Sequence, residues 1–216
     1  DTLSSGDNFD IDYAITNNNK VKIVNTIATI QYSRGSDEEG AQDIVKIPES
    51  YISIEAGETK IGKVSNVLLI GKDDERRSIK LNLVYEVEGA AASFNKTVGK
   101  DIALSPMNVE LGVSGVKEVR EAEQFDTKVM LINNTNTTLD NYKIEMLYPN
   151  GFTFISSSPT LVDNKYFEIN GLSKGEARSI TITGIQTGAA GEQSSIRANM
   201  YLNSDNKNLM VKANRS

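Results

Sequence analysis

The feature that most constrains this sequence is an internal similarity between its first and second halves. At an offset of 116 positions, Phe9-Asp10 falls on Phe125-Asp126 and Asn17-Asn18 falls on Asn133-Asn134 without a gap. Two further identities lie at the same offset, Tyr32 with Tyr148 and Gly35 with Gly151. A chain of 216 residues has room for one large domain or two small ones, and a duplication favours two. We therefore predict two domains that share one plan.

The later parts of the two halves correspond after small insertions. Gly57-Glu58 matches Gly175-Glu176 at an offset of 118. An alternating apolar series matches at 117, where Ile79, Leu81, Leu83 and Tyr85 fall on Ile196, Ala198, Met200 and Leu202. An offset of 116 would instead place Leu81 opposite Arg197, which breaks the two-residue period of a strand face. The offset of 117 therefore predicts an equivalent core strand in each half.

Runs rich in β-branched and aromatic residues, separated by Asn, Gly, Ser and Asp, predict β-strands throughout the chain. In the first domain, residues 1–105, these runs are 9–16, 26–32, 51–54, 78–88 and 93–104. In the second domain, residues 106–216, they are 125–132, 142–148, 152–156, 166–169, 178–185, 195–202 and 209–213. Residues 116–123 contain helix-favouring side chains, but the stretch is too short for a stable helix, so we expect extended chain or loop. Short strands at this spacing are typical of all-β sandwiches.

One strand pattern occurs only once. Met107, Val109, Leu111 and Val113 alternate with polar or small residues, as the first strand of the second domain would require. At the corresponding place the first domain has only the short stretch 2–3. We therefore predict that the first domain, as represented in this sequence, lacks the matching first strand.

The composition excludes several classes of function. The net charge of −6 argues against nucleic acid as a partner, because that binding rests on clustered Lys and Arg. The chain contains no His and no Cys, which removes Ser-His-Asp and Cys-His catalysis and His- or Cys-ligated metal sites. No apolar run approaches the length of about 20 residues that spans a bilayer. The start at Asp1-Thr2-Leu3 leads us to expect a mature or excised segment whose signal or anchor would lie outside it.

The motifs of the second half resemble a known family. The step from Tyr148 to Phe154 carries Pro-x-Gly-aromatic, and the turn Gly171-Leu172-x-x-Gly175-Glu176 precedes an alternating strand. These features are similar to the immunoglobulin-like repeat domains of bacterial and archaeal surface proteins, including the cell-adhesion-related (CARDB-like) domains. The first half departs from the pattern, since Ser33-Arg34-Gly35 replaces the Pro step and only Ala56-Gly57-Glu58 remains of the turn. The resemblance implies two tandem immunoglobulin-like β-sandwich domains.

The same resemblance implies a function outside the cell. Such repeats space, stiffen or present other domains, so we expect a non-catalytic structural or spacer module of a larger cell-surface or secreted protein. Its partners would be neighbouring domains of the same polypeptide, with a surface protein or a glycan as further candidates. An adhesin or glycan-binding pair is the alternative, and a two-domain periplasmic chaperone is a third hypothesis that the acidic balance disfavours. The family carries no shared catalytic residues, and we predict no cofactor, no metal and no membrane insertion within this segment.

Two sets of residues could form sites, and a structural role is favoured for each. Gly57-Glu58 and Gly175-Glu176 are expected to form turns in which Gly supplies a positive φ. Asp10 and Asp126 could bind calcium, with Asp7 and Asp12 or with Asp140 as further ligands, since hard cations favour clustered carboxylates. No D-x-D-x-D-G loop is present, so solvated strand faces are favoured instead. A glycosidase would need two positioned acids in a cleft with aromatic platforms, and the chain contains no Trp.

The junction between the domains predicts a stiff connection. The last strand of the first domain runs through Ser105-Pro106 into the second domain with almost no linker. Pro106 fixes its own φ and biases Ser105 towards extended backbone. We therefore expect two domains placed end to end, with a combined length of about 70 to 90 Å at roughly 3.3 Å per strand residue.

Overall fold

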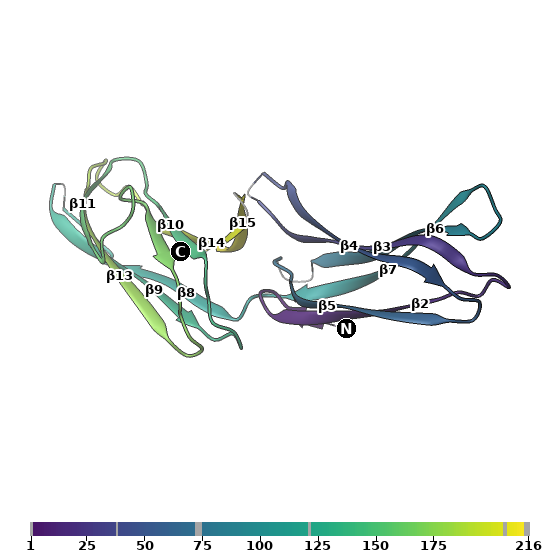
Figure 1. Ribbon diagram of the computed structural model, residues 1–216. Coiled ribbons are helices and arrows are strands. Elements are labelled where there is room, and N and C mark those ends of the chain that lie inside the picture. Colours follow the sequence, from purple (N-terminus) through teal and green to yellow (C-terminus); the bar gives the residue numbers. More distant parts are fainter. Residues whose placement is uncertain (1, 38, 72–74, 121, 205–206, 214–216) are drawn as a thin grey trace. The chain divides into compact units, whose positions relative to one another are not determined.

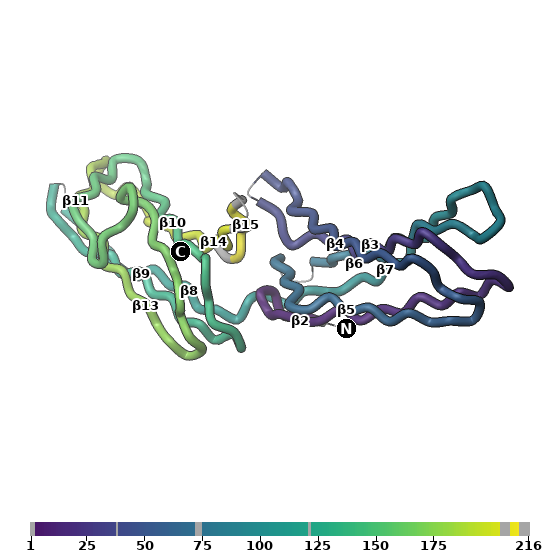
Figure 2. The backbone as a smooth tube through the Cα atoms, viewed as in Figure 1, coloured from purple at the N-terminus to yellow at the C-terminus, as the bar shows by residue number. Residues whose placement is uncertain are grey.

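The computed structural model describes residues 2–37, 39–71, 75–120, 122–204 and 207–213 (Figures 1 and 2). All helical or strand structure within these ranges is β-strand, which confirms the prediction of an all-β chain. No helix capable of crossing a membrane occurs among them. The chain divides into two compact units, Asp1–Ser36 with Gly40–Ser105, and Pro106–Ser216 with Asp37–Glu39. We call these unit one and unit two.

Unit one contains two sheets of unequal size. Its strands are β1 (Thr2–Ser4), β2 (Asn8–Thr16), β3 (Ile23–Ser36), β4 (Gln42–Ile54), β5 (Thr59–Leu68), β6 (Arg76–Val87) and β7 (Ser93–Ser105). The larger sheet has the order β1-β7-β6-β3-β4, and the smaller sheet consists of β2 and β5 alone. All pairings are antiparallel except the short parallel pairing of β1 with β7. Figure 1 shows the β2–β5 pair lying opposite the larger sheet.

Unit two contains two sheets of equal size. Its strands are β8 (Val109–Gly115), β9 (Gln124–Asn133), β10 (Tyr142–Leu147), β11 (Phe152–Ser158), β12 (Tyr166–Ile169), β13 (Ala177–Gln186), β14 (Arg197–Ser204) and β15 (Lys207–Ala213). One sheet has the order β11-β13-β9-β8, and the other has the order β12-β10-β14-β15. All of these pairings are antiparallel.

The core of each unit lies between its two sheets. In unit one, Ile15 of β2 and Val67 of β5 are buried with Ile30 of β3. In unit two, Val129 of β9 and Ile180 of β13 are almost completely buried, as are residues of the facing sheet: Ile144, Met146, Ala198 and Met200. Burial of each of the valine, isoleucine and methionine side chains among these contributes roughly 1.5 to 3 kcal/mol. Two sheets that enclose one apolar core are consistent with a β-sandwich in each unit.

Most predicted strands recur in the structure within a few residues, but β4 begins at Gln42, nine residues before the predicted run 51–54, and β1 and β5 are strands that the sequence did not predict. The β5 segment contains Gly62, Ser65 and Asn66, and these residue types are depleted in strands or favour turns. Pairing with β2 makes this segment a strand in spite of its composition. Residues 116–120, 122 and 123 have no helical structure, which agrees with the expected extended chain or loop.

The strand that precedes β2 differs from the strand that precedes β9. In unit two, β8 is the first strand that the alternating pattern of residues 107–113 predicted, and it pairs antiparallel with β9. In unit one, β1 pairs with β7 of the opposite sheet. Among the described residues, no strand pairs with the other edge of β2.

Candidate functional site

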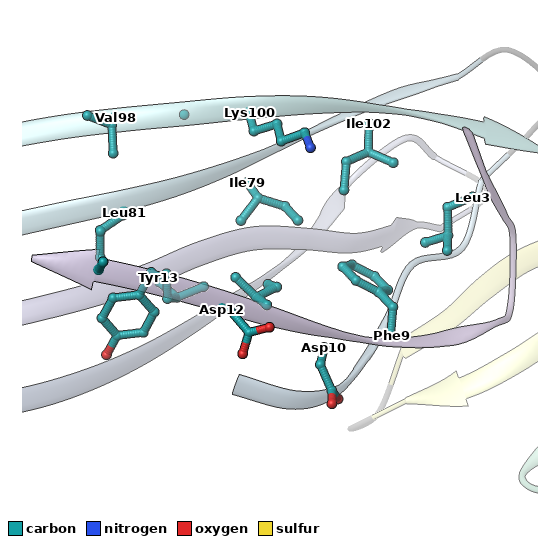
Figure 3. A pocket seen from close by; sticks show the side chains of 14 residues that line it. Leu3, Phe9, Asp10, Asp12, Tyr13, Ile79, Leu81, Val98, Lys100 and Ile102 are labelled. Carbon is teal, nitrogen blue, oxygen red and sulfur yellow. The ribbon is translucent and has the colours of Figure 1, made fainter. Parts of the chain in front are cut away.

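Unit one has a groove between β2 and β7, with a volume of about 520 Å³. Apolar side chains from four strands line much of it: Leu3, Phe9, Ile11, Ile79, Leu81, Val98 and Ile102. Figure 3 shows Val98 and Ile102 directed from β7 towards β2, with Ile79 and Phe9 between the two strands. The carboxylates of Asp10 and Asp12 are directed away from this space. The groove therefore offers an apolar floor beside the unpaired edge of a strand.

The groove is open because β2 lacks a neighbour on one side. The inner face of β9 in unit two is fully covered, with Val129 0% and Leu131 1% exposed. On the corresponding face of β2, Ile15 is buried as Leu131 is, but Ile11 and Tyr13 are only half-buried. The facing strand β7 is exposed over most of its length, and Val98 keeps 51% of its surface in contact with solvent. The side of unit one that corresponds to the β8 side of unit two is thus uncovered.

Tyr13 turns its ring away from the open edge and across β5. A Cβ atom placed on Gly62 would lie 2.1 Å from Cζ of this ring, so the ring occupies space that only a glycine leaves free. The Tyr13 hydroxyl donates a hydrogen bond to Glu49 on β4 and lies 3.4 Å from the Tyr51 hydroxyl oxygen. Desolvation, and then the hydrogen bond to Glu49, raise the pKa of Tyr13 well above its usual range. Tyr13 therefore remains a neutral hydrogen-bond donor.

Asp10 has structural partners within unit one. Its carboxylate lies 2.7 Å from Lys63 Nζ and accepts a hydrogen bond of 3.1 Å from the backbone N–H of Asn66. The Lys63 contact, followed by the Asn66 hydrogen bond, lowers the pKa of Asp10. Asn66 has a φ of 58°, so this carboxylate stabilises a left-handed residue at the bulged end of the β2–β5 pair. These contacts give Asp10 a role in fixing the strand pair.

The other acidic candidates lie in separate contacts. Asp126 accepts a hydrogen bond of 2.6 Å from Thr183 Oγ1, and Asp140 accepts one of 2.5 Å from the Gly171 backbone N–H. Asp12 lies on the exposed face of β2. Over the described ranges of the chain, no three His, Cys, Asp or Glu residues gather closely enough to hold a metal ion. The carboxylates of Asp10, Asp126 and Asp140 thus serve separate local contacts.

A buried asparagine joins two segments in each unit by the same hydrogen bonds. Asn133 Nδ2 donates to the carbonyl oxygens of Thr137 at 2.8 Å and Leu172 at 2.9 Å, while its Oδ1 accepts from the Thr135 backbone N–H. The equivalent contacts of Asn17, at 3.0 Å and 2.9 Å, involve the following residues: Val21, Ile54 and Asn19. Both asparagines are at most 2% exposed. Asn17 and Asn133 therefore each form a buried amide bridge between two segments of their unit.

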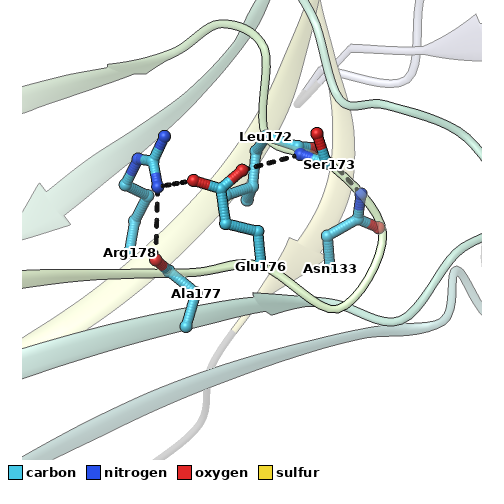
Figure 4. Close-up of polar contacts among 6 residues, drawn as sticks. All are labelled: Asn133, Leu172, Ser173, Glu176, Ala177 and Arg178. Atoms are coloured by element: carbon cyan, nitrogen blue, oxygen red, sulfur yellow. Dashed lines mark hydrogen bonds and ion pairs between the residues drawn. The ribbon is translucent and has the colours of Figure 1, made fainter.

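The turn with the sequence Gly-Glu completes this bridge. The Glu176 carboxylate accepts a hydrogen bond from the Ser173 backbone N–H at 3.0 Å and forms an ion pair with Arg178 (Figure 4). In unit one the corresponding contacts of Glu58 are with Glu55 N–H at 2.7 Å and Lys60 at 2.6 Å.

The glycine of each turn has a positive φ, 78° at Gly57 and 77° at Gly175, as predicted for the turn. The Gly57 N–H donates to Asn17 O at 2.8 Å, and the Gly175 N–H donates to Asn133 O at 2.6 Å. The Gly-Glu pairs are thus parts of a turn that closes over the buried asparagine.

The sequence did not identify the groove as a site. Its lining residues are ordinary strand residues. They are exposed because, among the described residues, no strand pairs with the other edge of β2. One signal could have located it: the alternating pattern of residues 107–113 has no counterpart before Phe9. A missing strand in a sandwich implies an open edge and an uncovered inner face.

Comparisons with known proteins do not assign a family. No family model matches the chain, and no curated protein matches it. Among solved structures, red sea bream transglutaminase aligns with 94% of this chain at 12% identity and a TM-score of 0.35, and the chain spans 28% of its length. The YadV chaperone aligns with 93% of this chain and 89% of its own at 10% identity and a TM-score of 0.27. We draw no inference about function from similarities at this level.

Proposed function

We propose that the chain is a non-catalytic structural or spacer module of a larger cell-surface or secreted protein, built from two immunoglobulin-like β-sandwich domains. The observation that carries this proposal is the structural use of the polar residues at matching positions of the two units. Asn17 and Asn133 are buried in the same hydrogen-bond pattern, and Glu58 and Glu176 close the same turn. Such residues stabilise the domain and leave little polar chemistry for a reaction.

The strand arrangement supports the immunoglobulin-like assignment within this proposal. In unit two, the first two strands of the unit, β8 and β9, pair side by side with β13 in one sheet, while β10, β14 and β15 form the other. In unit one, the short β1 pairs in parallel with the last strand, β7. The division of the strands of unit two between its two sheets is the one expected of immunoglobulin-type sandwiches. Neighbouring domains of the same polypeptide are the partners that this function requires.

An adhesin or glycan-binding pair is the second candidate, and the groove of unit one is the observation in its favour. Its lining is largely aliphatic, with Phe9 and Tyr13 as its aromatic members. A glycan site needs aromatic platforms with convergent polar groups, so this lining favours an apolar ligand over a sugar.

Small-angle scattering of the whole chain tests the spacer proposal. Two stiffly joined units should give a maximum dimension of about 70 to 90 Å, estimated from strands of roughly 3.3 Å per residue. The variant Pro106→Gly frees the φ angle at the junction and should broaden the distance distribution. A maximum dimension near 50 Å, unchanged by Pro106→Gly, would contradict a spacer, since it would mean that the units pack side by side.

A further inference from the structure

We propose that unit one is a strand acceptor: the free edge of β2 and the apolar groove beside it bind an extended segment of another polypeptide, antiparallel to β2, that carries apolar side chains at alternate positions. This site goes beyond the spacer function, because it gives unit one a protein ligand. The mode of binding is β-augmentation, in which backbone hydrogen bonds supply affinity and pockets for alternate side chains supply selectivity.

The hydrogen-bonding groups of the free edge can be assigned from the ladder. The Asn17 N–H donates to Glu58 O, and the register from Ile11↔Val64 to Thr16↔Thr59 is continuous. Because alternate residues of an antiparallel strand bond to the same neighbour, the remaining residues of this stretch direct their N–H and C=O groups to the free edge. These are Asp12, Ala14 and Thr16. A row of such groups is a template for another strand.

In unit two, β8 occupies the position equivalent to the free edge of β2, and its residues show which side chains fit there. Residues 128, 130 and 132 of β9, equivalent to 12, 14 and 16 at the offset of 116, lie opposite residues of β8. Val109 and Leu111 of this strand are buried at 4% and 7% exposed, and Met107, just before the strand, is 4% exposed. The free stretch of β2 from residue 11 to residue 16 is about 20 Å long at roughly 3.3 Å per residue. A segment of six or seven residues with the β8 pattern therefore fits it.

The residues that lead directly into β2 do not supply the missing strand. The residues that lead into β2 form β1, and β1 pairs with Ala103–Ser105 of β7 in the opposite sheet. The backbone of the described chain therefore reaches β2 by the far side of the groove. Leu3 from this stretch closes one end of the groove floor without covering the β2 edge. The edge is left for a strand that arrives separately.

The test uses the whole chain and a fluorescent synthetic peptide with the sequence of residues 107–115, MNVELGVSG. The matched control peptide replaces its second and third inward-facing residues, the equivalents of Val109 and Leu111, with Asp. We expect saturable binding by fluorescence anisotropy, at least tenfold weaker for the control peptide. Amide exchange measured by nuclear magnetic resonance should slow at Asp12, Ala14 and Thr16 when the peptide binds.

Two protein variants locate the site. Val98→Asp places a carboxylate on the exposed floor of the groove and should weaken binding at least tenfold. Ile52→Asp, at a position of β4 that is 91% exposed and outside the groove, is the matched control and should bind as the wild type does. Ala14→Pro removes one edge N–H while its side chain remains on the outer face, and it should also weaken binding.

Several results would overturn the proposal. Equal binding of both peptides would mean that the groove does not select apolar side chains. Slowed exchange in β9 instead of β2 would place the peptide in unit two. Self-association of the chain that protects the same β2 amides would identify a second copy as the occupant. Absence of binding would overturn the strand-acceptor proposal, and it would leave the scattering test of the spacer function unaffected.

Discussion

In unit two, β9 has a neighbouring strand on both edges, whereas in the described part of unit one β2 has a neighbouring strand on one edge only. In unit two, β8 covers the edge of β9, and Val129 and Leu131 on the inner face of β9 are fully buried. In unit one, β2 has the same alternation of inward and outward residues and its Ile15 is buried, yet Ile11 and Tyr13 remain half-buried. The difference teaches that alternation decides which residues can enter a core, whereas the neighbouring strand decides how deeply they are buried.

A second difference concerns the side chains at paired positions of neighbouring strands. In the β2–β5 pair of unit one Tyr13 lies opposite Gly62, and in the equivalent β9–β13 pair of unit two Val129 lies opposite Ile180. One large ring over a glycine fills the space that two aliphatic side chains fill elsewhere. The two units thus keep the same strand register with different distributions of side-chain volume.

The largest expected effect is the difference in stability loss between a substitution on the covered side of unit two and one on the open side of unit one. Leu111→Asp places an unpaired charge beneath β8 and should destabilise unit two by about 3 kcal/mol or more. Val98→Asp on the open side of unit one should change stability by no more than about 0.5 kcal/mol. Urea unfolding, with hydrogen exchange to separate the two units, measures both. Comparable losses in the two variants would mean that the groove side of unit one is covered in solution.

The next effect concerns a feature that the two units share. Asn17→Ala and Asn133→Ala each remove a buried amide and leave two carbonyl oxygens without their donor, so each should cost about 2 to 3 kcal/mol in its own unit. The exposed neighbours provide matched controls, and Asn18→Ala and Asn134→Ala should cost less than about 0.5 kcal/mol. A large loss in only one unit would show that the two amide bridges are not equivalent.

A smaller effect tests the exchange of volume between the units. Gly62→Val should destabilise unit one by about 1 to 3 kcal/mol, because its Cβ meets the Tyr13 ring. Combining it with Tyr13→Val creates an aliphatic pair like that of unit two and should recover part of the loss. A double-mutant cycle from thermal or urea unfolding gives the coupling. Simple additivity of the two substitutions would disprove the link between Tyr13 and Gly62.

The smallest effect is a dependence on pH. The Ser173 hydrogen bond, followed by Arg178, lowers the pKa of Glu176, and Lys60, followed by the Glu55 hydrogen bond, lowers the pKa of Glu58. A lowered folded-state pKa adds stability that is present above the ordinary value of about 4.5 and is lost as the pH falls through the folded-state pKa. Melting curves should therefore show Glu176→Gln and Glu58→Gln destabilising at pH 7 and converging on the wild type as the pH falls below the lowered folded-state pKa of each glutamate.

The exposed Glu118→Gln is the matched control for these two variants, and it should follow the wild type across this range. A constant difference between Glu176→Gln and the wild type at all pH values would contradict an ionic contribution. Both glutamates are substantially exposed, so solvent screening keeps their contribution small.

The sequence by itself determined the all-β class, most of the strands, and the turns at Gly57 and Gly175. It did so because strand alternation and the glycine requirement at positive φ are local properties that a single segment expresses. It also showed that the pattern at residues 107–113 has no partner in the first half. What each strand would pair with depends on segments far away in the chain.

Only the tertiary structure decided the roles that depend on those distant partners. Thr59–Leu68 is a strand because it pairs with β2, and β1 pairs with β7. Asn17 donates a hydrogen bond to Ile54, and Asn133 donates one to Leu172. The tertiary structure likewise decided that Val98 lines an open groove while Val109 is buried. Sheet pairing and burial are collective, because each strand face is completed by neighbours that no local pattern specifies.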